Sequence, residues 1–158
     1  IQPREQGNEE LFSTGCAGRI TSFEELDDGR YMIVLTGVSR FDILRETEPK
    51  RGYRNMAVDW ARYAHDLQAQ TCLNLDRSHL KAMMKSYFDQ QGLSCSWDAV
   101  DEASDDKLIT ALAMICPFAA KEKQALLEAP CCHTRATMFL TMLEMAIREG
   151  SCGCGGCH

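Results

Sequence analysis

The sequence predicts an α+β fold in which a small antiparallel β-barrel is followed by a C-terminal helical bundle. In the first third of the chain, short runs of β-branched and aromatic residues are separated by turn signals, which is typical of consecutive antiparallel strands. From about Asp59 onward, apolar residues recur every three or four positions, the period of amphipathic helices. We therefore divide the chain into a barrel part at 1–58, a helical part at 59–150 and a flexible Cys- and Gly-rich tail at 151–158.

The barrel part is expected to contain four short strands. The stretch GCAGRITSFEEL leads into the turn DDG, and RYMIVLTG follows it. Gly29 can adopt the positive φ that a tight hairpin turn requires. A second turn is expected at Gly37-Val38, before SRFDILRE, and YRNMAVDW forms a fourth strand. Consecutive short strands with tight turns favour a small antiparallel barrel or sandwich.

The helical part is expected to contain four helices. The first follows from DRSHLKAMMKSYFDQQG, where Gly92 supplies a natural end. Its apolar residues fall on one stripe: Leu80, Met83, Met84, Tyr87 and Phe88. The stretch WARYAHDLQAQ before it is either a short helix or an irregular crossover.

Caps and prolines delimit the other three helices. Ser104 can cap a helix that runs through KLITALAMIC to Pro117, and AAKEKQALLEA forms a helix that ends at Pro130. The last helix, TRATMFLTMLEMAIREG, is expected to end at Gly150. Connections this short predict a compact antiparallel bundle.

Composition and missing motifs exclude several function classes. The net charge of −6 argues against nucleic acid as the main partner, because that binding needs a concentrated basic face. The longest apolar run, ALAMICPFAA, is too short to span a bilayer. The chain carries no phosphate-loop, nucleophile-elbow or zinc-hydrolase motif, so the sequence predicts neither an enzyme nor a cofactor.

The nine cysteines do not have the spacing of a disulfide framework, and a reducing cytoplasm is the simpler inference. Two groups carry soft ligands that zinc prefers. Cys131, Cys132 and His133 form one group, and the helix after them separates it from the tail. The candidate ligands of the tail are Cys152, Cys154, Cys157 and His158. No folded loop holds the tail ligands apart, so we expect no metal site there beyond adventitious binding; the alternative is a metal bridge between two chains.

Five segments carry a resemblance to a known family: GCAGRI, DDGRYMIVLTGVSRFDI, YRNMAVDWARYAHDL, ICPFAAKEKQALLEAP and LTMLEMAI. Together they resemble the substrate-binding domain at the N-terminus of Lon-type ATP-dependent proteases. The resemblance extends from Ile1 to about Glu149 and is closest to stand-alone bacterial proteins of this family. It implies a PUA-like pseudobarrel whose first strand and helix would precede the chain. The residues that would make this fold are Gly15, Gly29, Gly37, Arg40 and Phe41, with Arg40 anchoring a nearby backbone group or carboxylate.

The resemblance implies a non-catalytic module that recognises unfolded or damaged protein in the cytoplasm and works with a separate protease. The recognition surface would be apolar and lie at the barrel–bundle junction, where Met83 and Met84 could contribute, although both also fit a bundle core. An unpaired strand edge would favour self-association. The alternatives are an adaptor for one folded partner, a remnant that carries a peptidase label by family alone, and an enzyme that uses the Cys-rich tail.

Overall fold

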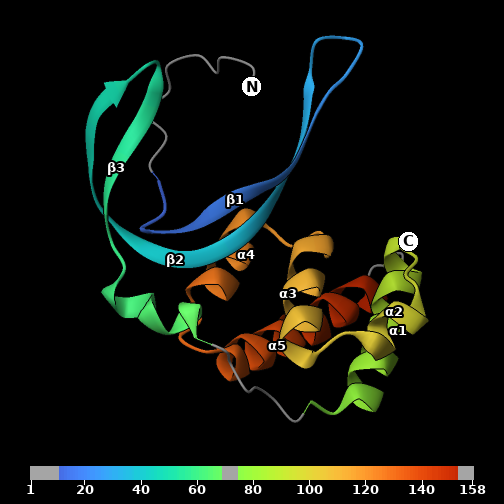
Figure 1. Ribbon diagram of the computed structural model, residues 1–158. Coiled ribbons are helices and arrows are strands. Elements are labelled where there is room, and N and C mark those ends of the chain that lie inside the picture. The colour runs from blue at the N-terminus through green and yellow to red at the C-terminus, as the bar shows by residue number, and fades with distance from the viewer. Residues whose placement is uncertain (1–10, 69–74, 153–158) are drawn as a thin grey trace, which may run out of the picture. The chain divides into compact units, whose positions relative to one another are not determined.

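The computed structural model describes residues 11–68 and 75–152, with side chains up to residue 150. The chain divides into two compact units, residues 1–70 and 71–158 (Figure 1). In its described residues, the first unit contains three β-strands and a 3-10 helix: β1 Thr14–Glu25, β2 Tyr31–Lys50, β3 Tyr53–Asp59 and η1 Ala61–Leu67. The second contains five α-helices: α1 Arg77–Gln91, α2 Trp97–Glu102, α3 Asp105–Ile115, α4 Ala120–Glu128 and α5 Cys132–Cys152. The α+β class predicted from the sequence is confirmed.

The turn between β1 and β2 forms where the sequence predicts it. Gly29 has a φ of 76°, a conformation that strains residues with a side chain. Its amide donates a hydrogen bond of 2.9 Å to the carbonyl of Leu26. Arg30 closes the turn through a backbone bond from Leu26 to its carbonyl.

The second predicted turn, at Gly37-Val38, is wrong. β2 runs without interruption through both residues. Ala17 faces Ser39 while the next residue of β1 faces Gly37, so Val38 has no partner in the register. Val38 is therefore the extra residue of a β-bulge, which bends a strand instead of reversing it. A single strand replaces the two that were predicted, and Figure 1 shows it curving between β1 and β3.

The sheet is open within the described part of the chain. Its strand order is β1-β2-β3, and all pairings are antiparallel. The first half of β2 pairs with β1, and the second half, from Asp42 onward, pairs with β3. These three strands do not close into the barrel that the sequence predicts.

Gly15 and Phe41, two of the residues that the resemblance implies for the fold, are direct partners across β1 and β2. A Cβ on Gly15 would lie 2.6 Å from two carbons of the Phe41 ring. That ring packs edge-on against Trp60 with 5.2 Å between the ring centroids. The glycine thus makes room for an aromatic side chain.

Gly15→Ala should lower the free energy of unfolding by about 1–3 kcal/mol, because the Phe41 ring must move to avoid overpacking. Gly37→Ala is the matched control, since a Cβ there meets only Cys16 Sγ at 3.4 Å. Urea titrations of both variants check this. Equal losses in the two variants would contradict the steric explanation.

In the second unit, α5 contacts α1, α3 and α4. The apolar stripe predicted on α1 is buried, and Met84 has no exposed surface. Met83 is 8% exposed, so both methionines belong to the core and not to a recognition surface. The other buried members of this core come from the four remaining helices and from the C-cap of α3: Val100, Leu108, Ile109, Leu112, Cys116, Leu126, Ala136, Phe139 and Leu143. Among the described residues, no helix is long and apolar enough to cross a membrane.

Three helix predictions need correction. The sequence predicts no helix at α2, because six residues are too few to show a helical period; its one buried residue is Val100. Ser104 occupies the N-cap position of α3 without a capping hydrogen bond from its side chain. α5 continues past Gly150, where a Cβ would lie 2.6 Å from Oε1 of Gln90. That glycine permits close packing beside α1 instead of ending the helix.

Candidate functional site

One side of the β1–β2 hairpin carries a set of large apolar side chains that we call the apolar hairpin face. Residues directly opposite each other in an antiparallel pair project to the same side of the sheet, and alternate residues of one strand share a side. β2 contributes three large apolar residues at alternate positions, and two of them lie opposite large apolar residues of β1. The members of the face are Ile20, Phe23, Tyr31, Ile33 and Leu35.

A β-bulge at Thr21 assembles this face. Ile20 pairs with Leu35, and Ser22 pairs with Val34, so Thr21 is left over in the register. Ile20 and Phe23 are three positions apart and would project to opposite sides of a regular strand. With the extra residue between them they share one side. The hydroxyl of Thr21 donates to the carbonyl of Val34 at 3.3 Å, which ties the bulge to β2.

The face is exposed to an unusual degree. Its five members have relative exposures between 47% and 63%. Phe23 and Tyr31 stack with 5.0 Å between their ring centroids, so they cover each other only in part. The opposite side of the hairpin mixes Met32 and Val34 with polar residues such as Ser22 and Glu24. A contiguous exposed apolar patch of this kind typically marks a binding surface.

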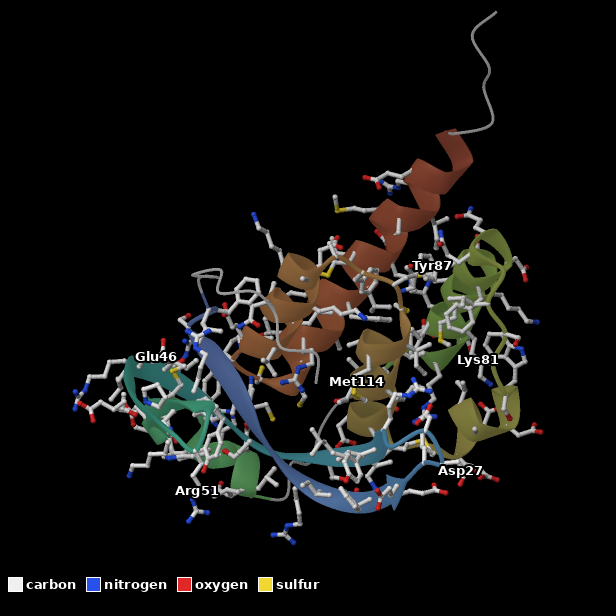
Figure 2. All side chains as sticks on the ribbon, turned by 90° about the horizontal axis from the view of Figure 1, so that it is seen from above. Asp27, Glu46, Arg51, Lys81, Tyr87 and Met114 are labelled. Atoms are coloured by element: carbon white, nitrogen blue, oxygen red, sulfur yellow. The ribbon has the colours of Figure 1, made fainter. Side chains whose placement is uncertain are left out.

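Acidic residues surround the tip of the hairpin, where Figure 2 shows Asp27. Glu24, Glu25 and Asp27 are all near the turn, and none of them has an ion pair among the described residues. Asp28 differs, because the side chain of Arg30 donates to it at 2.7 Å and lowers the pKa of its carboxyl. The tip therefore presents negative charge next to an apolar face.

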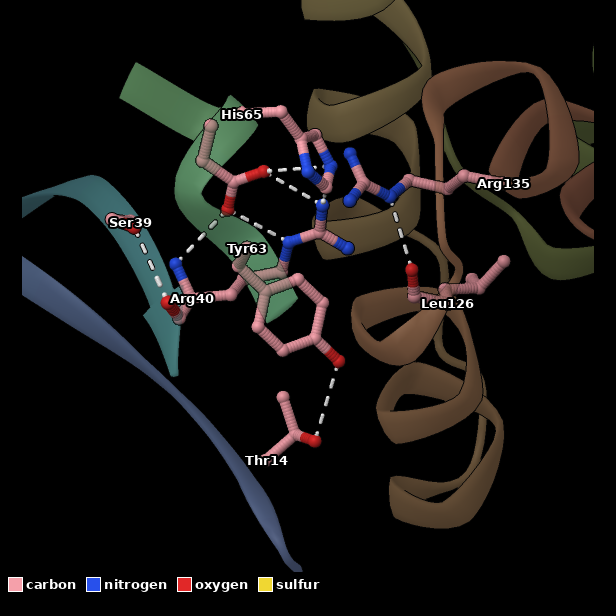
Figure 3. Close-up of polar contacts among 8 residues, drawn as sticks. Thr14, Ser39, Arg40, Tyr63, His65, Leu126 and Arg135 are labelled. Carbon is pink, nitrogen blue, oxygen red and sulfur yellow. Dashed lines mark hydrogen bonds and ion pairs between the residues drawn. The ribbon is translucent and has the colours of Figure 1, made fainter. Parts of the chain in front are cut away.

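The other end of the hairpin is fixed by a buried ion pair (Figure 3). Arg40 is 5% exposed, and its guanidinium contacts both carboxylate oxygens of Asp66 on η1, at 2.8 and 2.7 Å. The backbone amide of Arg40 donates to the same carboxylate at 3.0 Å. The carboxylate that Arg40 anchors is thus Asp66, and the pair attaches β2 to η1.

Aromatic and hydroxyl groups complete this cluster. The Arg40 guanidinium lies 4.3 Å from the centroid of the Tyr63 ring, and the Tyr63 hydroxyl is 3.4 Å from Oγ1 of Thr14. His65 Nε2 is 3.3 Å from Arg40 Nη2. Burial opposes the charge on Arg40, but hydrogen bonds and charge from Asp66 outweigh it and raise its pKa. These contacts indicate that Arg40 has a structural role.

The candidate metal ligands do not come together in the described residues, which contain no group of three or more residues able to hold a metal ion. The side chains of the tail candidates, Cys152 to His158, lie outside the described residues. In the other group, Cys132 is disulfide-bonded and so provides no thiolate. Cys131 is a free, exposed thiol.

Cys131 should be alkylated by iodoacetamide much faster than Cys116. A hydrogen bond from the side chain of Thr134 lowers the pKa of Cys131, whereas burial raises the pKa of Cys116 to about 11. Reactivity follows the thiolate fraction and access to solvent. Peptide mass spectrometry at pH 7.5, with a urea-unfolded control, measures both rates. Comparable rates in the folded chain would contradict this ranking.

The apolar hairpin face was not predicted as a site. Its alternating signal is present in the sequence at Tyr31, Ile33 and Leu35, but alternation alone does not distinguish a face that fills a barrel from one that faces solvent. Ile20 and Phe23 are three positions apart, so without knowledge of the bulge the sequence does not place them on the same face. Of the predicted fold residues, Gly15, Arg40 and Phe41 are grouped at the opposite end of the hairpin from Gly29.

Comparisons with known proteins give a family. Residues 2–145 match the family model described as the ATP-dependent protease La (LON) substrate-binding domain. The fold is similar to the crystal structure of a Lon N-terminal domain protein from Xanthomonas campestris. The TM-score is 0.56 at 18% identity, and the match covers 82% of this chain and 68% of that chain. A search of curated proteins found no match. The family match spans most of the chain, so this chain belongs to the Lon substrate-binding domain family, a family of substrate-binding modules.

Proposed function

We propose that the chain binds unfolded or damaged polypeptide on the apolar hairpin face and itself carries out no catalysis. The single observation that supports this most is the exposure of five large apolar side chains on one side of the hairpin. The family supports binding of protein substrates in general. Unfolded chains differ from native ones in the apolar segments they expose, so an apolar face selects for the unfolded state. A separate protease would receive the bound substrate.

The expected binding is weak. Full burial of a large apolar side chain is worth about 1.5–3 kcal/mol, and about half of that remains to be gained at each position of the face. The five residues together would yield roughly 5 kcal/mol before the cost of association is subtracted. The face alone therefore supports dissociation constants no tighter than about 200 μM, so substrate exchanges rapidly.

A matched pair of substitutions tests this site. Leu35 is 63% exposed on the apolar hairpin face, and its neighbour Val34 is 51% exposed on the opposite side. Leu35→Glu and Val34→Glu introduce the same charge into the same strand. The fluorescence anisotropy of a labelled, permanently unfolded polypeptide should report binding that Leu35→Glu weakens at least tenfold and Val34→Glu changes less than threefold.

The natively folded form of the same polypeptide is the second control. Absence of binding to the unfolded form, or equal sensitivity to the two glutamate variants, would overturn the proposed site. Saturable binding of a folded protein with the same dependence on Leu35 would instead assign the face to an adaptor function.

A further inference from the structure

We propose that the bound polypeptide adds to the free edge of β1 as an extended strand. The segment selected in this way has apolar residues at alternate positions and a basic residue beside the hairpin tip. The inference rests on the proposed function and specifies the mode and chemistry of recognition. It follows from the strand edge, the neighbouring apolar face and the charge at the tip.

The outer edge of β1 has no partner strand among the described residues. There β1 lies at one edge of the sheet, and β2 is the strand it pairs with. Over Ser22–Glu25 it keeps unbroken register with β2 residues 31–34, so its backbone groups are regularly spaced there. Within the described residues, no hydrogen bond reaches this segment from any strand except β2. An edge of this kind is a template for another extended chain.

The free part of β2 is a poorer template. At its inner end the backbone amide of Arg40 is already bound to Asp66 Oδ2 at 3.0 Å, and η1 packs against this strand. From Asp42 onward the same edge is taken by β3. In the part of β2 between the turn and Arg40, the bulge at Val38 interrupts the regular spacing of the backbone groups. Of the two described edges of the hairpin, the β1 edge combines regular spacing with direct access to the apolar hairpin face.

Strand addition sets the periodicity of the ligand. Main-chain bonds to β1 would supply affinity, while every second side chain of the ligand would lie beside Phe23 on the apolar side. The side chains in between would lie beside Ser22 and Glu24. A segment with alternating apolar and polar residues satisfies both sides, whereas a uniformly apolar segment does not.

The negative charge of the tip favours a basic residue in the part of the ligand that lies beside the tip. Glu24 and Glu25 end the segment, Asp27 follows at the turn, and only Asp28 is neutralised by Arg30. A lysine or arginine placed beside these carboxylates gains attraction, and an acidic residue is repelled. Opposite charges across the contact therefore favour a basic flank at the tip.

A fluorescein-labelled peptide of alternating valine and threonine with two N-terminal lysines is the probe for this inference. Two matched peptides carry N-methyl groups on alternate amides, one on the odd set and one on the even set. In an added strand only every second amide faces the sheet. Anisotropy titrations with the full chain should show one N-methyl set weakening binding at least tenfold and the other changing it less than threefold. Replacing both lysines with glutamates should weaken binding several-fold at low salt and less at 0.5 M salt.

The outcomes separate this inference from the proposed function. Equal effects of the two N-methyl sets, with binding still dependent on Leu35, would overturn strand addition and leave apolar binding on the face intact. Failure of both the peptide and the unfolded polypeptide to bind would overturn the proposed function itself. Sedimentation equilibrium is run in parallel. A dimer that Leu35→Glu dissociates and the peptide does not would assign the edge to a second copy of the chain and overturn the inference.

Discussion

Asp66→Ala should lower the free energy of unfolding of the first unit by about 3–5 kcal/mol, the range typical of breaking a buried ion pair from one side. Asp66 accepts three hydrogen bonds from Arg40, two from the guanidinium and one from the backbone. Without the carboxylate, a guanidinium whose side chain is only 6% exposed keeps its charge and loses the ion pair with Asp66. Urea unfolding followed by Trp60 fluorescence, in a Trp97→Phe background, measures the loss.

The exposed pair between Arg54 and Glu46 is the matched control. It has the same two-pronged geometry, with both hydrogen bonds at 2.7 Å, but its side chains are 50% and 44% exposed. Figure 2 shows Glu46 at the β2–β3 end of the sheet. Surface pairs contribute at most about 1 kcal/mol, so Glu46→Ala should have a small effect. Similar losses for the two variants would show that burial is not what makes the Arg40–Asp66 pair important.

The buried Arg40–Asp66 pair also predicts how stability depends on pH. Hydrogen bonds from the Arg40 side chain lower the pKa of Asp66 in the folded chain below its usual value of 3.8. A group with a depressed pKa stabilises the fold fully above its unfolded pKa, and the contribution is lost as pH falls through the folded pKa. Stability should therefore decline below about pH 4 more steeply in the native chain than in Asp66→Ala. Parallel acid titrations of the two chains, followed by Trp60 fluorescence, check the difference in slope.

Phe139→Ala should destabilise the second unit by about 3–5 kcal/mol, the usual cost of removing a buried phenylalanine ring. The Phe139 side chain is completely buried, and its ring packs edge-on against Phe118 with 5.8 Å between the centroids. α5 contacts three other helices, so a cavity on its buried side affects several packing surfaces at once. Trp97 fluorescence in a Trp60→Phe background reports this unit.

Met145→Ala, on the same helix, is the control for the effect on helix propensity of introducing an alanine into α5. Met145 is 55% exposed, so its truncation removes little buried surface and should change stability by less than about 0.5 kcal/mol. A loss for Phe139→Ala below about 1 kcal/mol would mean that the surrounding helices collapse into the space, and that α5 is not the centre of this core.

The helices were more predictable than the sheet, because their signals are local. The Asp76 side chain caps α1 by accepting from the amide of His79, and Gly92 ends the helix in the left-handed conformation, so both ends are visible in the sequence. By contrast, Gly37-Val38 forms a bulge in a continuous strand. A glycine followed by renewed alternation looks the same before a turn and at a bulge, and only the partner strand decides between them.

The candidate site was less predictable for a related reason. Whether Tyr31, Ile33 and Leu35 face solvent depends on which elements cover them, and sequence alternation is the same in both cases. The methionines of α1 showed the converse problem: their flexibility fits a recognition surface, yet packing places Met83 and Met84 in the core. Arg40 could be assigned to an anchoring role from its type, but its partner Asp66 is 26 residues away in the chain.

The bulge at Thr21 also determines where the chain tolerates a change in length. Loss of this one residue would leave Ile20 opposite Leu35 and Ser22 opposite Val34, so each side chain would stay on its present side. Deletion of a residue within Ser22–Glu25 would instead shift the register and turn neighbouring side chains over. The same reasoning applies to Val38 in β2. Single-residue gaps in alignments of related chains should therefore concentrate at these two positions. Sequences that lack either residue should keep apolar residues on the same side of the hairpin.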